Sequence, residues 1–485
     1  MAKLKRFVSV VLSATLAFGA VGCSKGQTPK NGKEGEKTPV LKVFMPGPQQ
    51  KDLKLVLDEV NKITEKKIGA KIDMSFIDDG AYTEKMNMKL ATKEKFDICF
   101  TGYINPYATG VDNEVYYPLT ELIDRNCPEL WKEMPDFWWD AVRRNGEIYA
   151  VPNQQVATTV PALTMDRKWA DKYNFDWEKV SSVDDIEPFL QTIKDNEPDY
   201  YPTRPYGNYW IKNYEGITTG VGIDLREKGL KAIYQWDAEG FMEGLGKIRE
   251  WFEKGYFRSD IASVMNDETD FKAGKYIVTG TGWKPGFEAT QNAMLGGDNI
   301  AMKINRPTIG TATLIATMYA VSKYSDNPDY AIKFINLVNT DKDVYNLLAH
   351  GIEGKHYTWV DDKHIKLNEN GGYYVNASWK FGNQFNAYLL EGQDENVWEE
   401  TVKFNETADR SRLIGFLFST ENVQTEISQI ATVNKEYKNM LNNGSADYKT
   451  YFKEYKKKMM DAGIENVLKE VQRQLDEFSK KSKEN

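Results

Sequence analysis

Residues 148–165 read IYAVPNQQVATTVPALTM and form an uncharged stretch in a chain of which 28% of residues are charged. Pro152 and Pro161 would break a helix, and the polar residues between them would be costly in a lipid bilayer. The β-branched residues favour extended structure. The stretch therefore predicts a buried strand, a polar elbow and a second strand.

The elbow carries three amide side chains, Asn153, Gln154 and Gln155. Amides both donate and accept hydrogen bonds, so these residues suit a neutral ligand that is rich in hydroxyl groups. A polar loop that only joins two core strands is the alternative reading of the same residues, and the residues alone do not exclude it.

Length and composition limit the classes of function. A chain of 485 residues is long enough for two or three domains. The net charge is −8, and there is no basic patch of the kind that nucleic-acid binding needs. Only three His are present, so we expect no His-based metal or catalytic centre and no cofactor. The 12 Trp and 27 Tyr suit ligands that are half apolar and half polar.

The N-terminal segment has the pattern of a targeting signal. Lys3, Lys5 and Arg6 precede an apolar stretch at residues 7–20, which ends in Ala-Val-Gly-Cys at Cys23. This segment resembles a bacterial lipoprotein signal. The resemblance implies a signal peptide over residues 1–22 and a lipid attached to Cys23.

Residues 23–39 predict a flexible tether, because after the Cys they contain no apolar side chain larger than Pro. We therefore expect a soluble body held by lipid at the outer face of the bacterial cell membrane. Loss of the three cationic residues of the signal would take the net charge from −8 to −11. Cys99 and Cys127 would remain, and we expect two free thiols.

Strand-like and helix-like segments alternate in the first part of the chain, over residues 41–45, 53–63, 71–77, 82–92 and 96–100. This alternation predicts an α/β fold with a mostly parallel sheet flanked by helices. In such sheets ligands bind outside the carboxyl ends of the strands. Tyr103 and Asn105 follow the third strand at that edge and are candidate ligand-binding residues.

Two later segments also carry aromatic candidates. Residues 200–210 form an aromatic loop that ends in Trp210, which either contacts a ligand or plugs the core. Residues 280–286 read GTGWKPG, which lacks the final Lys-Ser/Thr of a phosphate-binding loop. Three glycines around Trp283 predict an exposed indole face. Residues 311–321 predict an uncharged strand, followed by a helix that begins near Pro328.

The order of several motifs resembles the family 1 extracellular solute-binding proteins of ABC importers. These motifs are the lipoprotein signal, ALTMDRKWADKYNF at 162–175, FKAGKYIVTGTGW at 271–283 and the segment from YAVSK to GKHY at 319–357. The tail, with FGNQF at 381–385, is similar to a lipoprotein subgroup whose C-terminal region is uncharacterised. The resemblance implies two α/β lobes joined by crossing strands, with the ligand between them.

The resemblance also implies which residues bind the ligand. Trp283 matches the Trp that stacks on a sugar, and the remaining matched or nearby candidates are Tyr103, Asn105, Asn153, Gln154, Gln155, Trp210, Glu353, His356, Tyr357, Asn383 and Gln384. We expect a monomer that captures an oligosaccharide and delivers it to the membrane permease of an ABC importer.

The lobe boundaries expected from this order of motifs are approximate. Residues 40–160 and about 300–350 are expected in lobe 1. Residues 161–299 and about 351–485 are expected in lobe 2, with two C-terminal helices at 445–460 and 464–479.

Three other functions compete with this interpretation. An extracellular glycoside hydrolase needs two paired carboxylates, and the sequence pairs none. A binder of a peptide-like ligand would use the same aromatic residues. An adhesion or scaffold protein would not need an uncharged crossover between lobes. The sequence therefore favours a binding protein that is not an enzyme.

Overall fold

The structure is a computed structural model that describes residues 38–264 and 267–484. Residues from Pro39 onward form one compact unit. The expected signal peptide, Cys23 and nearly all of the tether lie outside the described residues. Within the described ranges, none of the helices combines the length and the apolar character needed to cross a membrane.

The first sheet has the strand order β2-β1-β3-β15-β6. Strands β1 (Val40–Pro46), β2 (Lys71–Ile77) and β3 (Ile98–Gly102) are parallel, whereas β15 (Thr317–Val321) is antiparallel to both β3 and β6 (Ala150–Pro152). The helices of this part of the chain are α1 (Leu53–Ile68), α2 (Asp79–Ala91), α3 (Tyr107–Asp112), α4 (Thr120–Asn126), α5 (Asp136–Val142), α11 (Thr311–Leu314), α12 (Pro328–Thr340), α13 (Lys342–His350) and α14 (Val397–Thr407).

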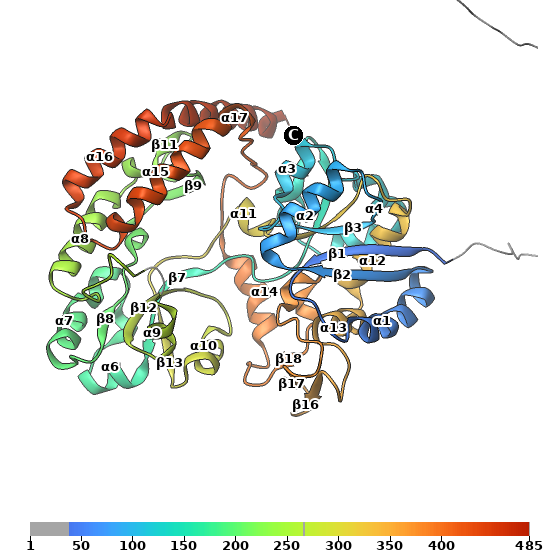
Figure 1. Ribbon diagram of the computed structural model, residues 1–485, viewed down its shortest axis with the longest axis horizontal. Helices are drawn as coiled ribbons and strands as arrows, with labels where there is room; N and C mark the ends of the chain where they lie inside the picture. The colour runs from blue at the N-terminus through green and yellow to red at the C-terminus, as the bar shows by residue number, and fades with distance from the viewer. Residues whose placement is uncertain (1–37, 265–266, 485) are drawn as a thin grey trace, which may run out of the picture. The chain divides into compact units, whose positions relative to one another are not determined.

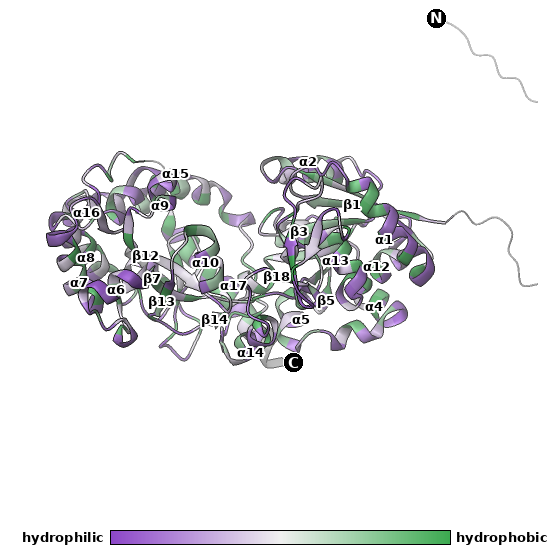
Figure 2. Ribbon diagram, turned by 90° about the horizontal axis from the view of Figure 1, so that it is seen from below, coloured by the Kyte–Doolittle hydropathy of each residue, from purple (hydrophilic) through white to green (hydrophobic). Residues whose placement is uncertain are grey.

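The second sheet has the order β13-β7-β12-β8. Strand β7 (Val160–Asp166) is antiparallel to β12 (Tyr276–Trp283) and β13 (Asn299–Lys303), and β12 is parallel to β8 (Tyr201–Thr203). Its helices are α6 (Arg167–Tyr173), α7 (Glu187–Asn196), α8 (Phe241–Glu253), α9 (Glu268–Lys272) and α10 (Phe287–Leu295). Figure 2 shows that α6 is mostly hydrophilic.

The α/β fold is confirmed, and in each sheet one strand runs against the others, β15 in the first sheet and β7 in the second. The reason is connectivity. Strand β15 brings the chain back from the second sheet and so enters the first sheet against β3. Strand β7 brings the chain into the second sheet from the first, and it runs antiparallel to both of its neighbours, β12 and β13.

The C-terminal region consists of three helices and contacts a small third sheet. Helices α15 (Gln424–Asn442), α16 (Tyr448–Asp461) and α17 (Ile464–Glu484) contact one another and lie side by side in Figure 1. Strands β9 (Tyr214–Thr218), β10 (Val221–Asp224) and β11 (Ala232–Tyr234) share their core with these helices, as the expected packing of the last helix against a lobe requires.

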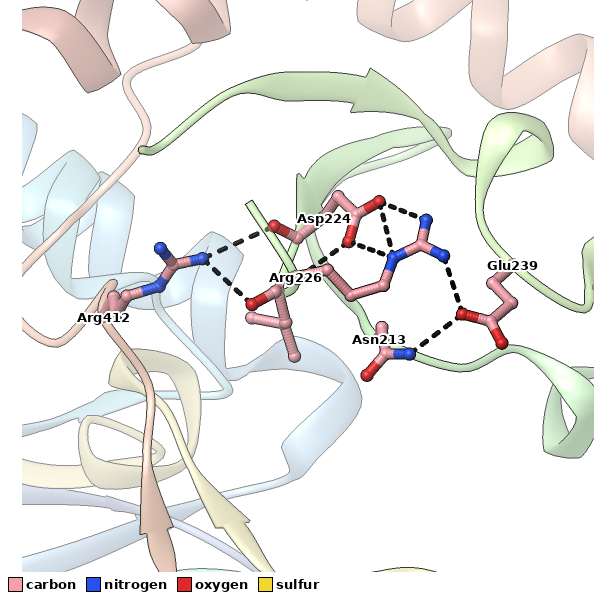
Figure 3. A network of polar contacts seen from close by, with 6 residues as sticks. Asn213, Asp224, Arg226, Glu239 and Arg412 are labelled. Carbon is pink, nitrogen blue, oxygen red and sulfur yellow. Dashed lines mark hydrogen bonds and ion pairs between the residues drawn. The ribbon is translucent and has the colours of Figure 1, made fainter. Parts of the chain in front are cut away.

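A network of hydrogen bonds and ion pairs joins Arg412, which precedes the C-terminal helices, to the third sheet (Figure 3). The guanidinium group of Arg412 donates to the backbone carbonyls of Glu227 and Lys228, at 2.6 and 3.0 Å. Beside it, Arg226 pairs with Asp224 and donates to Glu239 at 2.8 Å. The hydrogen bonds from Arg226 lower the pKa of Asp224 to about 2, so this carboxylate stays ionised.

Along the described chain, the hydrophobic core in which successive residues pack changes at three places. These three changes define the lobes. Ala157 belongs to the first core and Leu163 to the second; Met302 belongs to the second and Ile309 to the first. A third crossing follows Ala408, because residue 413 already belongs to the core of the C-terminal helices. At this crossing β14 (Thr308–Ile309) pairs with β19 (Asp409–Arg410).

The expected assignment of residues 351–408 to the second lobe therefore differs from the structure. Tyr373, Phe381 and Ala387 pack in the first core. This segment contains only short strands, β16 (Tyr357–Trp359), β17 (His364–Leu367) and β18 (Leu389–Leu390), which are too short to show a periodic pattern.

Two further expectations have clear outcomes. Residues 311–321 do not form one strand, because α11 takes the first four residues and β15 begins at Thr317. The expectation of two free thiols is confirmed, since Cys99 and Cys127 are both buried and unpaired.

The remaining described strands form a hairpin, β4 (Arg143–Arg144) and β5 (Glu147–Ile148).

Candidate functional site

Trp283 is positioned by the pairing of β12 with the crossing strand β7. In the antiparallel register, Trp283 lies opposite Val160 and Gly282 lies opposite Pro161. A Cβ atom on Gly282 would lie 2.8 Å from Oγ1 of Thr159, so a glycine is required for this close approach. The Gly-rich segment noted in the sequence thus brings the indole to the point where the chain crosses between lobes.

Three side chains hold the indole of Trp283 in place. Its Nε1 donates to Oε1 of Glu288 at 2.9 Å. The ammonium of Lys303, on β13, lies 3.1 Å from the centre of one ring face. The ring of Phe404, on α14, packs edge-on at 5.6 Å and 80°. Because Lys303 covers one face, we infer that a ligand stacks on the opposite face.

A second aromatic group lies at the carboxyl end of β3. Tyr103 is 51% exposed, and its ring lies 5.8 Å from that of Trp379. Desolvation, with a smaller effect of the Asp79 charge, raises the pKa of Tyr103 to about 12.

Amide groups connect these two aromatic groups. Nε2 of Gln155 donates to Oγ1 of Thr317 at 2.6 Å, and the backbone N–H of Gln384 donates to the carbonyl of Gln154 at 2.8 Å. Gln154 and Asn383 form an isolated parallel bridge. The structure therefore brings residues 154–155 and 383–384 together although they are far apart in the sequence. We call Tyr103, Gln155, Trp283, Asn383, Gln384 and Phe404 the crossover site.

Several predicted residues lie nearby but are buried. Asn105 has a left-handed φ of 58° and donates to the hydroxyl of Tyr116 at 3.1 Å. Asn153 donates to the carbonyl of Lys380 at 2.8 Å. Within the described protein, Oδ1 of Asn153 and Nε2 of Gln154 have no hydrogen-bond partner. These three side chains are buried under the surface of the site and are not accessible to a ligand.

The other predicted residues lie apart from the crossover site. Trp210 is buried in the second core and donates to Asp184 at 3.2 Å. His356 is buried, accepts the backbone N–H of Ile352 at its Nδ1 and contacts Asp52 through Nε2. Tyr357 is also buried, whereas Glu353 is exposed on the preceding turn. Aromatic and amide composition alone did not distinguish these core positions from ligand-facing ones.

The sequence analysis missed residues that the fold brings to Trp283 from distant segments. Glu288 and Lys303 come from elements that follow β12, and Phe404 comes from α14. No local pattern would have paired Lys303 with Trp283, because their contact reaches across β7.

A cavity of about 880 Å³ lies elsewhere, between the β4–β5 hairpin and the C-terminal region. Its lining includes charged side chains that pair within the protein, such as Arg144 with Asp112 and Arg473 with Glu477. It shares no residue with the crossover site. We therefore place the candidate site at Trp283, whose indole Glu288, Lys303 and Phe404 hold at the crossing. Within the described ranges, no cluster of His, Cys, Asp or Glu is arranged to hold a metal.

Comparisons with known proteins match almost the whole chain. A carbohydrate ABC transporter substrate-binding protein of Streptococcus pneumoniae serotype 4 is 29% identical over 494 residues, which cover 98% of this chain and 97% of the relative. The crystal structure of the N-glycan transport solute-binding protein NgtS from Streptococcus pneumoniae is 26% identical, with a TM-score of 0.81, and 91% of this chain and 99% of NgtS are covered. Over nearly its whole length the chain is therefore similar to solute-binding proteins of ABC importers.

Two other matches refine this assignment. NgtS in complex with Man5GlcNAc is 27% identical, with a TM-score of 0.67, and 91% of this chain and 99% of that chain are covered. Residues 412–480 match a domain of unknown function, DUF3502. These residues include most of α15–α17, so the match confirms the resemblance of the tail to the uncharacterised C-terminal region of the subgroup.

Asn405 fixes the first crossing of the chain between the lobes. Its Oδ1 accepts the backbone N–H of Ala157, and its Nδ2 donates to the carbonyl of Gln155, both at 2.8 Å. Replacing Asn405 with alanine should leave both buried backbone groups unpaired and lower the free energy of unfolding by about 2 kcal/mol. Urea unfolding measures this change. Thr407→Ala, on an exposed turn of the same helix, is the control, and an equal loss in both variants would contradict the role of Asn405.

Proposed function

We propose that this protein binds a carbohydrate, most simply an oligosaccharide, at the crossover site and delivers it to the permease of an ABC importer. The observation that carries the proposal is the indole of Trp283, which Glu288, Lys303 and Phe404 hold at the crossing. A pyranose ring has an apolar C–H face that stacks on an indole, and its hydroxyl groups both donate and accept hydrogen bonds.

Two features of the site support a sugar over other neutral ligands. Aromatic side chains lie at both ends of the site, with Tyr103 and Trp379 at the end of β3 and Trp283 and Phe404 at the crossing. Between them lie amides and hydroxyls, including Gln155 and Thr317. The relatives named above also support a sugar, because one is a substrate-binding protein of a carbohydrate ABC transporter and the other is an N-glycan transport solute-binding protein.

We propose that the protein binds its ligand without chemical turnover. Glu288 is the carboxylate in direct contact with Trp283, and its oxygen accepts the indole N–H. This contact assigns Glu288 a role in positioning Trp283. A glycoside hydrolase would need a pair of carboxylates as acid and base, and no such pair is identified at this site.

A calorimetric and thermal-shift screen tests the proposal. It uses neutral and acidic glycans of one to five sugars, with short peptides as the control ligands. At 100 times its dissociation constant, a specific ligand stabilises the folded state by about 2.7 kcal/mol. Binding of a glycan, with the glycan recovered intact by chromatography, supports the proposal. Binding of peptides alone, or shortened glycan products, would contradict it.

We further propose that the mature protein is a monomer attached to the outer face of the cell membrane through a lipid on Cys23. The anchor follows from the signal-like segment, which lies outside the described residues. Cells grown with a labelled fatty acid should yield labelled protein, and the Cys23→Ser variant should be unlabelled and released into the medium. A labelled Cys23→Ser protein would disprove lipid attachment at this residue.

A further inference from the structure

An exposed aromatic group lies on the small sheet formed by β16, β17 and β18, outside the crossover site. Trp359, the last residue of β16, is 38% exposed, and the adjacent Val360 is 50% exposed. The ring of Tyr388 lies 4.8 Å from that of Trp359, at an angle of 58°. We call Trp359 and Tyr388 the aromatic platform. Adjoining exposed apolar side chains of this kind mark a surface that contacts a ligand or a partner.

Neighbouring side chains hold the two rings of the platform in place. The ring of Tyr357 packs edge-on against Trp359 at 6.1 Å and 85°. The ring of His350 stacks on Tyr388 at 6.4 Å and 20°, and the ammonium of Lys342 lies 5.6 Å from the centre of the Tyr388 ring. Because these groups already contact Tyr388, the indole of Trp359 provides most of the accessible aromatic surface. An indole that is fixed and partly exposed needs little ordering when a ligand stacks on it.

The platform adjoins the crossover site through residues 384–388. The backbone N–H of Ala387 donates to the carbonyl of Gln384 at 3.0 Å, and Tyr388 is the next residue. Standard backbone dimensions then place the Cα of Tyr388 within about 8 Å of the carbonyl oxygen of Gln384. In both views β18 lies between α10 of the second lobe and α13 of the first (Figures 1 and 2). The platform therefore extends the amide end of the crossover site.

A carboxylate lies beside the rings of the platform. Glu353 and Tyr357 form an isolated parallel bridge, and the backbone N–H of Gly354 donates to the carbonyl of Tyr357 at 2.8 Å. The side chain of Glu353 is exposed, and no residue that the structure describes forms an ion pair or a hydrogen bond with it. A carboxylate accepts hydrogen bonds from sugar hydroxyls while an indole stacks on the C–H face of the same ring.

We propose that the aromatic platform binds a second sugar unit of the glycan whose first unit stacks on Trp283, with Trp359 as the stacking face and Glu353 as a hydrogen-bond acceptor. This inference rests on the proposed function and adds a preference for length. A monosaccharide reaches only the crossover site, whereas a glycan of several units contacts both positions. The second contact is then intramolecular, so the longer glycan binds more tightly without any change at Trp283.

Calorimetry with neutral glycans of one to seven units and the same linkage tests this inference. In the unmodified protein the affinity should rise by about 10-fold or more at the length that reaches the platform, because a well-placed aromatic contact contributes on this scale. Trp359→Ala should remove the rise and leave the affinity for the shortest bound glycan unchanged. Glu353→Gln should reduce the rise several-fold.

Trp177→Ala removes a partly exposed indole of the second lobe and is the matched control, which should keep the rise with length. Circular dichroism establishes that each variant is folded. A rise that persists in Trp359→Ala, or an equal loss at every length, would overturn the role of the platform while leaving carbohydrate binding intact. Normal binding of all lengths together with lost uptake by cells would also overturn it and make the platform a permease contact. Failure of every glycan to bind the unmodified protein would instead overturn the proposed function itself.

Discussion

Replacing Trp283 with alanine is expected to raise the dissociation constant for the bound carbohydrate at least about 30-fold. Truncation of a central aromatic residue in a desolvated site typically costs about 2 kcal/mol or more. The effect should be large here because Glu288, Lys303 and Phe404 hold the indole before the ligand arrives, so little ordering is needed on binding. Isothermal titration calorimetry of the purified variant measures the change.

Two variants serve as controls for this prediction. Trp283→Phe keeps an aromatic face but loses the hydrogen bond to Glu288, so its affinity should lie between those of the unmodified protein and Trp283→Ala. Trp177→Ala removes a partly exposed indole that contacts Arg167 on the second lobe, away from the crossing. If Trp177→Ala weakened binding as much as Trp283→Ala, the loss would reflect general damage and the stacking role would be wrong.

The second large effect concerns stability in acid and centres on His350. Its ring is buried against Tyr388, and neither ring nitrogen has a hydrogen-bond partner among the described residues. Burial lowers the pKa of His350 to about 4 from an ordinary value of 6.5. Between these values the unfolded chain binds a proton that the folded protein does not. The free energy of unfolding should therefore fall by about 3 kcal/mol as the pH drops from 6.5 to 4.

Replacing His350 with phenylalanine should remove this component of acid sensitivity and leave stability at pH 7.5 unchanged or higher. The other two histidines change the profile in known directions. Burial lowers the pKa of His356, which adds to the effect. For His364 burial also acts to lower the pKa, but the contacts with Asp361, Gln393 and Glu395 together outweigh it and raise the pKa. His364→Phe should therefore not reduce the acid sensitivity. Urea unfolding across this pH range gives the profile, and an unaltered pH slope in His350→Phe would refute the prediction.

The α/β architecture was predictable because its signals are local. The uncharged stretch around Pro152 and Pro161 does form β6, a polar elbow and β7, as its composition predicted. Helix α1 followed from apolar residues at helical spacing and from Gly69, whose left-handed φ of 72° ends the helix. The Gly-rich segment indicated Trp283 correctly as a special position, since only a glycine at 282 permits the approach to Thr159.

The missed features are non-local. Assignment of residues 351–408 to a lobe depends on packing of residues such as Tyr373 and Phe381, which short irregular segments do not reveal. The direction of a strand such as β15 depends on the side from which the chain returns from the other lobe. At the site, Asn105 and Trp210 have the composition of ligand-binding residues, but their hydrogen bonds are satisfied inside the protein. Burial of a polar or aromatic residue is decided by distant segments, and one sequence does not report it.

A crystal structure of the protein with the tightest-binding glycan tests the central claim most directly. The account predicts a sugar ring parallel to the indole of Trp283, on the face opposite Lys303, with its hydroxyl groups within hydrogen-bond distance of Gln155, Asn383 or Gln384. A glycan bound in the 880 Å³ cavity beside the C-terminal region, with Trp283 free of contact, would contradict it.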